Sequence, residues 1–305
     1  MSTNPHPDTA DTFTEIAWPY QVLAKASAHV GADPTEARLI KFTNNAAFAL
    51  PASGLVVRIS GSSPVAHRAR TVVAVARWLA EHEMPTIRLA TTLPQPLDID
   101  GHAVTFWKLV PDTGPQPTGH DLGRILRRFH ALPDTSADLP AWNTLGMIRV
   151  RIGAADFLAP DERVFLTKTA DAIASDLDDV DYLWEPGPIH GDPIIGNLIP
   201  GPDGPVLCDF DSTCTGPREW DLIPAAVGQL RFRYAIDYHA QLTEAYGTDI
   251  RTWSGFGVFR RLRELQLVCS ALPTLSTDTR FLAQWRHRFD TLRAGDLDAQ
   301  WALYR

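Results

Sequence analysis

The sequence predicts an α+β protein in two parts, a smaller one with an antiparallel β-sheet and a larger one that is mainly helical. Short apolar runs separated by turn residues fill much of the first hundred positions, as is typical of strands joined by tight turns. Apolar residues at helical spacing dominate the second half. Between the two, residues 111–119 hold three prolines and two glycines, which indicates a linker. We therefore expect domains over 1–110 and 111–305.

The smaller part combines helices with a meander of strands. A first helix ends at Gly31, because glycine readily takes the left-handed conformation of a helix cap. A second helix shows apolar residues on one face and arginines elsewhere. The expected elements are helices over 19–30 and from 65 up to Pro85, and strands over 39–42, 46–50, 55–60, 87–90 and 102–110.

The larger part is predicted to be helical except for one hairpin. The apolar runs 198–200 and 205–208 flank Gly201-Pro-Asp-Gly204, which predicts two strands with a four-residue loop. The expected helices cover 121–132, 161–177, 220–246 with a break, 256–272 and 277–292.

Composition excludes several kinds of partner and site. The net charge of −8 leaves no basic field for nucleic acid or for an anionic membrane. The N-terminus lacks the basic and apolar regions of a secretory signal, and the longest uncharged stretch, 42–57, is too short to span a bilayer. We therefore expect a cytoplasmic protein. Three cysteines without a C-x-x-C pair indicate neither a disulfide framework nor a zinc site.

The hairpin brings two oxygen ligands together. Pairing Leu198 with Leu207 places Asn197 opposite Cys208 and therefore beside Asp209. An amide oxygen and a carboxylate are ligands that Mg²⁺ accepts, with phosphate oxygens and water completing its octahedron. The open end of the hairpin is therefore a candidate metal site.

A specific pattern precedes the hairpin. The string His190-Gly-Asp192-Pro-Ile-Ile-Gly-Asn197 has the form H-x-D-x-x-x-x-N, and Cys-Asp209-Phe-Asp211 and Gly-Pro-Arg-Glu-Trp-Asp221-Leu follow it in order. This succession resembles the aminoglycoside phosphotransferase and choline kinase family, which is related to protein kinases. Kinases likewise place a catalytic-loop Asp and Asn before a metal-binding Asp.

The resemblance implies a two-lobed, protein-kinase-like fold: a small lobe of antiparallel sheet plus helix, and a larger, mainly helical lobe. It also implies transfer of the γ-phosphate of ATP or GTP to a small-molecule hydroxyl, with Mg²⁺ as cofactor. Asp192 matches the catalytic residue, Asn197 and Asp209 match the metal ligands, and His190 and Asp221 match positions that brace the loop. Asp211 either contacts a second ion or caps a turn. Histidines outside the motif, among them His130, are assigned no role.

In the small lobe the resemblance assigns nucleotide contacts. Arg58 occupies the place of the strand lysine that contacts the phosphates, and arginine is a good bidentate phosphate ligand. Residues 43–46 replace the glycine-rich loop, so that Asn45 or the backbone would approach the phosphates. In the hinge-like run 102–110, the further nucleotide-contacting candidates are Trp107, Lys108 and Val110; Trp107 could equally be a core residue.

One position departs from the family. The helix glutamate that pairs with the strand lysine or arginine is replaced by Val72. Either another group holds Arg58, or Arg58 meets the phosphate unassisted, or the protein has lost activity. A catalytically silent kinase-like binding protein is therefore the alternative function.

Charge suggests the polarity of the acceptor. Residues 153–214 hold 13 acidic and 2 basic residues, which predicts a negative potential that favours a cationic small molecule. These acids could instead solubilise a helix away from the site. A metal-dependent hydrolase is disfavoured by Asn197, where a histidine ligand would be expected. A protein kinase is disfavoured because no activation segment separates Asp209 from Asp221.

Overall fold

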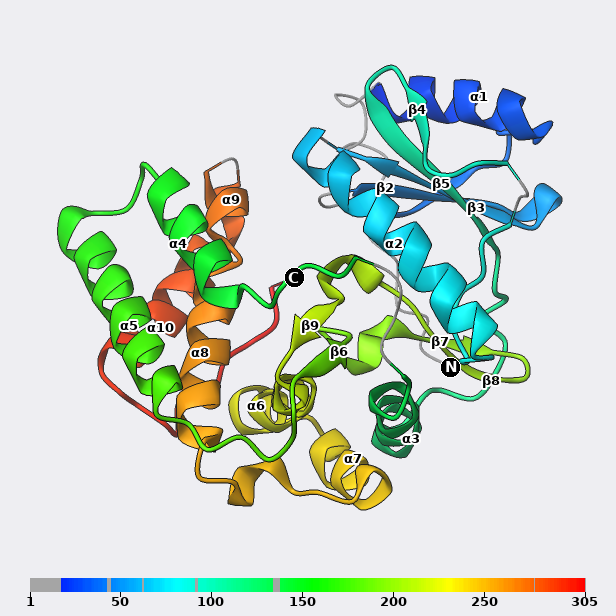
Figure 1. Cartoon of the computed structure of the whole chain (residues 1–305). Coiled ribbons are helices and arrows are strands. Elements are labelled where there is room, and N and C mark those ends of the chain that lie inside the picture. Colours follow the sequence, from blue (N-terminus) through cyan, green and yellow to red (C-terminus); the bar gives the residue numbers. More distant parts are fainter. Residues whose placement is uncertain are drawn as a thin grey trace, which may run out of the picture. The chain divides into compact units, whose positions relative to one another are not determined.

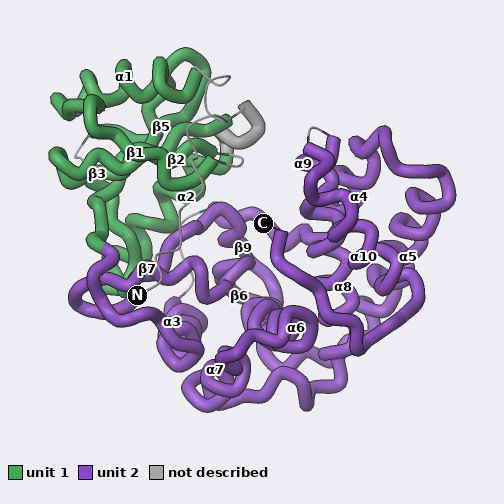
Figure 2. The backbone as a smooth tube through the Cα atoms, turned by 180° about the vertical axis from the view of Figure 1, so that it is seen from behind, with its two compact units in different colours: residues 1–111 green, residues 112–305 purple. Residues whose placement is uncertain are grey.

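The computed structural model describes residues 18–42, 45–61, 63–90, 93–133, 138–276 and 278–304. The chain forms two compact units, Met1–Pro111 and Asp112–Arg305, which Figure 2 shows in different colours. None of the described helices is long and apolar enough to cross a membrane.

Unit 1 is a five-stranded antiparallel sheet with two helices (Figure 1). The strand order is β1-β2-β3-β5-β4, so the first three strands form the meander that the sequence predicts. The helices are α1 (Trp18–Val30) and α2 (Ser63–Glu81), and the strands are β1 (Arg38–Phe42), β2 (Asn45–Leu50), β3 (Leu55–Ser60), β4 (Leu97–Ile99) and β5 (His102–Lys108).

One face of the sheet packs against α1. Because side chains alternate along a strand, Phe48, Val57 and Phe106 lie on the same face, where they form a buried cluster with Leu23 of α1. The alternate positions, among them Arg58, point to the opposite face of the sheet.

The expected strand 87–90 is wrong in part. Residues 88 and 90 exchange backbone hydrogen bonds with β5, from Lys108 N to Arg88 O at 2.8 Å and from Ala90 N to Phe106 O at 3.0 Å. The segment makes an isolated bridge to β5 and no strand, and β4, which the sequence did not predict, pairs with β5 beyond it.

Unit 2 is mainly helical and carries two small two-stranded sheets. The capping box at the start of α3 illustrates why its helices begin where they do: the Thr118 side chain accepts from Asp121 N, and the Asp121 carboxylate accepts from Thr118 N at 2.8 Å. The helices are α3 (Gly119–His130), α4 (Thr144–Ala154), α5 (Pro160–Asp178), α6 (Ile223–Phe232), α7 (Tyr238–Tyr246), α8 (Phe256–Cys269), α9 (Leu272–Leu275) and α10 (Leu282–Arg293).

The predicted register of the hairpin is confirmed. Strands β7 (Leu198–Gly201) and β8 (Gly204–Leu207) pair Leu198 with Leu207, and Cys208 N donates to Asn197 O at 2.9 Å. The loop is shorter than expected, because Gly201 and Gly204 pair with each other and leave two residues in the turn. Strands β6 (Gly187–Ile189) and β9 (Cys214–Gly216), which the sequence did not predict, form the second small sheet.

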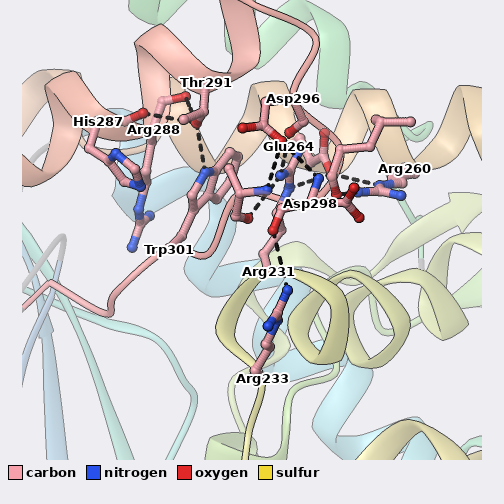
Figure 3. Close-up of polar contacts among 12 residues, drawn as sticks. Arg231, Arg233, Arg260, Glu264, His287, Arg288, Thr291, Asp296, Asp298 and Trp301 are labelled. Atoms are coloured by element: carbon pink, nitrogen blue, oxygen red, sulfur yellow. Dashed lines mark hydrogen bonds and ion pairs between the residues drawn. The ribbon is translucent and has the colours of Figure 1, made fainter.

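The segment after α10 is held through its backbone and through the buried side chain of Trp301, whose indole N–H donates to Thr291 at 3.0 Å. In Figure 3, arginine side chains of α6, α8 and α10 surround residues 296–302. Arg231 is 1% exposed; it pairs with Glu264 at 2.7 Å and also donates to the carbonyl oxygens of residues 296 and 299. The side chains that donate to backbone oxygens of 296–303 are Arg231, Arg233, Arg260, Gln284, His287 and Arg288.

Candidate active site

The loop 190–197 connects β6 to β7 in unit 2 and carries the predicted catalytic residue. Gly191 has a φ of 86°, and a Cβ at this position would overlap the backbone oxygen of Ser212. Only glycine combines this conformation with so close an approach. The glycine in the motif therefore allows the loop to cross the turn that follows Asp209.

Asp221 braces this loop from within the protein. Its carboxylate is fully buried and accepts hydrogen bonds from His190 N and Gly191 N, both at 2.8 Å. Trp220 adds a third tie, because its indole N–H donates to Gly191 O at 2.8 Å. A buried carboxylate needs such donors to offset its lost hydration. The Asp221 carboxylate therefore links the start of the loop to the 3₁₀ turn Arg218–Leu222.

His130 completes the environment of Asp221, so the expectation that it has no role is wrong. Its Nε2 donates to the Asp221 carboxylate at 3.0 Å, and its Nδ1 faces the Tyr246 hydroxyl at 2.9 Å. Burial, followed by the nearby Asp221 charge, raises the pKa of Tyr246, so this hydroxyl stays protonated and can donate to Nδ1. The contact joins α3 to the 3₁₀ turn Arg218–Leu222 across 91 sequence positions, which is why spacing alone did not reveal it.

His190 and Asn197 tie the loop to the hairpin. The His190 ring is fully buried; its Nε2 donates to Cys208 O at 3.0 Å, and its Nδ1 accepts from Asp192 N at 3.4 Å. The Asn197 amide nitrogen donates to Asp192 O at 2.9 Å. The backbone of Asp192 is therefore held on both sides, while its side chain remains 39% exposed.

Asp209 has an unusual backbone. Its φ and ψ of 67° and 66° lie in the left-handed region, which a non-glycine residue rarely adopts. Backbone strain of this kind concentrates at functional sites, where the surrounding structure enforces it. Asp209 immediately precedes the short 3₁₀ turn Phe210–Ser212, so Asp211 lies one residue into that turn. Both carboxylates are half-buried.

The donor set fits Mg²⁺ that is shared with phosphate oxygens. Asn197 uses its amide nitrogen within the loop, which leaves its Oδ1 as the atom for a cation, and Asp209 follows the residue bonded to Asn197 O. Among the described residues, no group of three or more His, Cys, Asp or Glu side chains could hold a metal. Two hard oxygen donors suit an ion that brings its other ligands with a nucleotide.

The structure also brings a cationic side chain to Asp192 that the sequence did not reveal. Arg263 of α8 forms an ion pair with Asp192, with 2.9 Å between Nη2 and Oδ1. Its guanidinium also donates from Nη1 to Gln266 at 2.6 Å. In the sequence Arg263 lies among the other charged residues of α8, Arg260, Arg261 and Glu264, so no pattern marks it, and its partner lies in a distant loop.

The predicted nucleotide contacts lie in unit 1. Arg58 and Trp107 share the sheet face opposite α1, in register with Thr105 and Val56 respectively. Trp107 is 3% exposed and its indole N–H donates to Thr105 at 2.9 Å, which is the environment of a core residue. The other candidates are Asn45 at the start of β2, the exposed Lys108 at the end of β5, and the half-buried Val110.

The departure at Val72 is a buried position of α2, with 2% of its surface exposed. Of the loop 43–46 that replaces a glycine-rich loop, residues 43 and 44 lie outside the described part of the chain.

Comparison with solved structures gives the same fold. The chain is similar to the amicoumacin kinase hAmiN in complex with AMP-PNP, Ca²⁺ and Ami, at a TM-score of 0.67 and 13% identity over 93% of this chain and 95% of that one. It is similar to a choline/ethanolamine kinase family protein from Mesorhizobium loti, at a TM-score of 0.62 and 17% identity over 90% of this chain and 94% of that one. It is similar to the GDP and kanamycin complex of APH(2")-IIia, at a TM-score of 0.63 and 14% identity over 90% of this chain and 99% of that one. No match was found among the curated proteins.

The sheet-and-helix unit and the mainly helical unit define a kinase-like α+β fold. A sequence model of the phosphotransferase enzyme family matches residues 41–265. The chain belongs to this family, as the resemblance of its motifs predicted.

Proposed function

We propose that this protein transfers the γ-phosphate of ATP or GTP to a hydroxyl group of a small molecule. The observation that carries the proposal is the loop 190–197, which is fixed from several sides while the side chain of Asp192 remains accessible. Phosphoryl transfer demands positioning and charge neutralisation more than covalent chemistry, so a rigid loop with one accessible carboxylate suits it.

Asp192 acts on the acceptor. Its carboxylate accepts the proton of the acceptor hydroxyl, whose oxygen forms the new bond to the γ-phosphorus. The bond from that phosphorus to the bridging oxygen of the nucleotide breaks, and the nucleoside diphosphate leaves with the electron pair. Catalysis by a positioned carboxylate of this kind contributes about 10²–10⁴-fold to the rate.

The candidate nucleotide contacts come from unit 1, and the candidate metal ligands come from unit 2. Arg58 contacts the phosphates as a bidentate donor, and Asn45 and the hinge residues Trp107, Lys108 and Val110 are further candidate nucleotide contacts. Asn197 and Asp209 would hold Mg²⁺ through oxygen atoms, and Asp211 would support the same turn. When bound there, the ion would supply positive charge that offsets the charge of the phosphate oxygens.

The second candidate function is a catalytically silent kinase-like binding protein. The buried Val72 favours it, because α2 offers no carboxylate at that position to orient Arg58. Such a protein would bind a magnesium nucleotide and release no product.

We further propose that the acceptor is cationic, because residues 153–214 include 13 acidic and only 2 basic residues. The structure reduces this field, since five of those acids form ion pairs with arginines from outside the segment. The pairs are Asp161–Arg293, Glu162–Arg286, Asp171–Arg149, Asp176–Arg261 and Asp192–Arg263. The exposed acids that follow α5, at positions 178, 179, 181 and 185, remain to attract a cation.

The test is a transfer assay on purified protein. MgATP and MgGTP are each incubated with kanamycin, amicoumacin, choline and ethanolamine, and mass spectrometry detects the phosphorylated product. A neutral sugar alcohol in the same panel tests the polarity of the acceptor. Turnover that weakens as salt rises, because ions screen the attraction, supports a cationic acceptor.

The matched control is Asp192→Asn, which keeps the size of the side chain and removes its charge. Loss of product in this variant with unchanged nucleotide binding supports the proposal. Nucleotide binding without product for any acceptor, or without release of diphosphate, supports the silent alternative. Equal turnover by the variant removes Asp192 from the mechanism.

A further inference from the structure

Arg263 approaches Asp192 from a different part of unit 2. It belongs to α8, while Asp192 lies in the loop after β6. The pair joins the two elements with 2.9 Å between Nη2 and Oδ1. Arg263 is 8% exposed, so the pair is screened from water at the arginine end.

A buried guanidinium requires compensation for its lost hydration. Gln266 supplies one neutral acceptor at 2.6 Å, and Asp192 supplies the negative charge. Among the residues that the structure describes, Asp192 is the one carboxylate in an ion pair with Arg263. Burial raises the pKa of the neighbouring Tyr234, although the charge of Arg263 opposes this. The phenol therefore stays neutral and does not replace Asp192 as the anionic partner of Arg263.

The two oxygen atoms of Asp192 are not equivalent. Oδ1 faces Arg263 and is shielded from solvent, although the side chain as a whole is 39% exposed. The exposed oxygen is therefore Oδ2. With the backbone of Asp192 tied to His190 and Asn197, an ion pair on Oδ1 restrains the remaining rotation of the side chain.

The helix that presents Arg263 is itself fixed. The flanking residues Leu262 and Leu265 are fully buried, and Glu264 forms ion pairs with Arg231 and Arg260, both at 2.7 Å. Arg263 therefore has little freedom to follow a moving loop, and it holds Asp192 in one orientation.

We propose that Arg263 is a positioning residue that fixes Asp192 through Oδ1 and so selects Oδ2 as the oxygen that takes the acceptor's proton. This proposal rests on the proposed function, because it assigns Asp192 the role of proton acceptor. Arg263 acts through Asp192, so its removal lowers kcat and leaves the KM for the nucleotide unchanged.

The experiment compares Arg263→Gln and Arg263→Lys in the transfer assay, with the first acceptor of the panel that the wild type phosphorylates. Misplacing a reacting group by about 1 Å costs about 10²-fold, so Arg263→Gln should lower kcat by about 30–100-fold. Arg263→Lys keeps the charge and loses the planar fork, so it should stay within about tenfold of the wild type. Arg149→Gln, which removes an exposed ion pair with Asp171, is the matched control and should leave kcat unchanged.

A double-mutant cycle separates positioning from an independent effect. In the Asp192→Asn background, Arg263→Gln should change kcat by less than about twofold, because Asp192 is the group through which Arg263 acts. An equal loss in both backgrounds, or an unchanged kcat in Arg263→Gln, overturns the proposal.

The cycle is also measured by thermal unfolding, which needs no acceptor. The Tm losses of Arg263→Gln and Asp192→Asn should not add, because each removes the same ion pair. If the wild type shows no phosphoryl transfer, the proposed function fails, and this second cycle still decides the contact. Additive Tm losses would then contradict the claim that Arg263 fixes the Asp192 carboxylate. Tm losses that do not add would support it.

Discussion

Replacing Asp221 by asparagine should loosen the loop that carries Asp192. The carboxylate accepts three hydrogen bonds, two on Oδ2 and one on Oδ1. An asparagine amide has one oxygen, so its NH₂ group faces at least one N–H donor and loses that bond. The bonds that remain become neutral and weaker.

The loss can be sized from these contacts. A hydrogen bond to a charged group contributes about 1.5–3 kcal/mol, and a buried donor left without an acceptor costs about 1–3 kcal/mol. Relief of the buried charge offsets part of this. We expect a net destabilisation of about 3 kcal/mol, which lowers Tm by about 6–12 °C for a unit of this size.

The assay is thermal unfolding followed by circular dichroism, with Asp203→Asn as the control. Asp203 is an exposed residue of the hairpin turn, so its substitution should leave Tm unchanged. A Tm for Asp221→Asn within about 2 °C of the wild type would refute the bracing role.

Other substitutions test the remaining parts of the site. Asn197→Ala and Asp209→Ala should each raise the Mg²⁺ concentration needed for nucleotide binding in a titration, with the larger effect for Asp209 because it carries formal charge; equal effects would contradict this. Gly191→Ala should lower the free energy of unfolding in denaturant by more than about 2 kcal/mol, since its positive φ and its close approach to backbone both exclude a Cβ; wild-type stability would show that the loop adapts. Hydrogen bonds from Arg251 lower the pKa of Asp249, so Asp249→Asn should be less stable than the wild type at neutral pH, and the difference should shrink below pH ~4 as the wild type takes up protons; a constant difference from pH 7 to pH 3 would be inconsistent with this.

Short-range chemistry made much of the fold and site predictable. The hairpin register follows from one turn flanked by apolar runs, and it placed Asn197 next to the strand that leads to Asp209. The loop motif could be identified because its residues lie within eight positions of one another. In both cases the contacts form between residues that are close in sequence.

Contacts between distant elements were not predictable in the same way. Strands β6 and β9 are three residues each and pair across the hairpin, so neither has a pattern of its own. The partner of Arg263 and the role of His130 depend on how α8 and α3 pack against the loop. A single sequence does not encode these distances in any local pattern. The net charge of residues 153–214 overstates the local negative potential for the same reason, because five of its acids pair with arginines outside the segment.

The segment after α10 has a consequence for sequence variation. Its carbonyl oxygens, rather than its side chains, accept the hydrogen bonds of Arg231, Arg260 and Arg288. Every amino acid offers the same carbonyl, so exposed positions such as Leu297 should tolerate most residues in a mutational scan. The arginines should tolerate few, because each donates in a fixed direction from a buried or half-buried site. At such exposed positions selection should therefore act on the arginines alone, whereas Trp301 is constrained because its buried ring stacks with Arg231 and donates to Thr291.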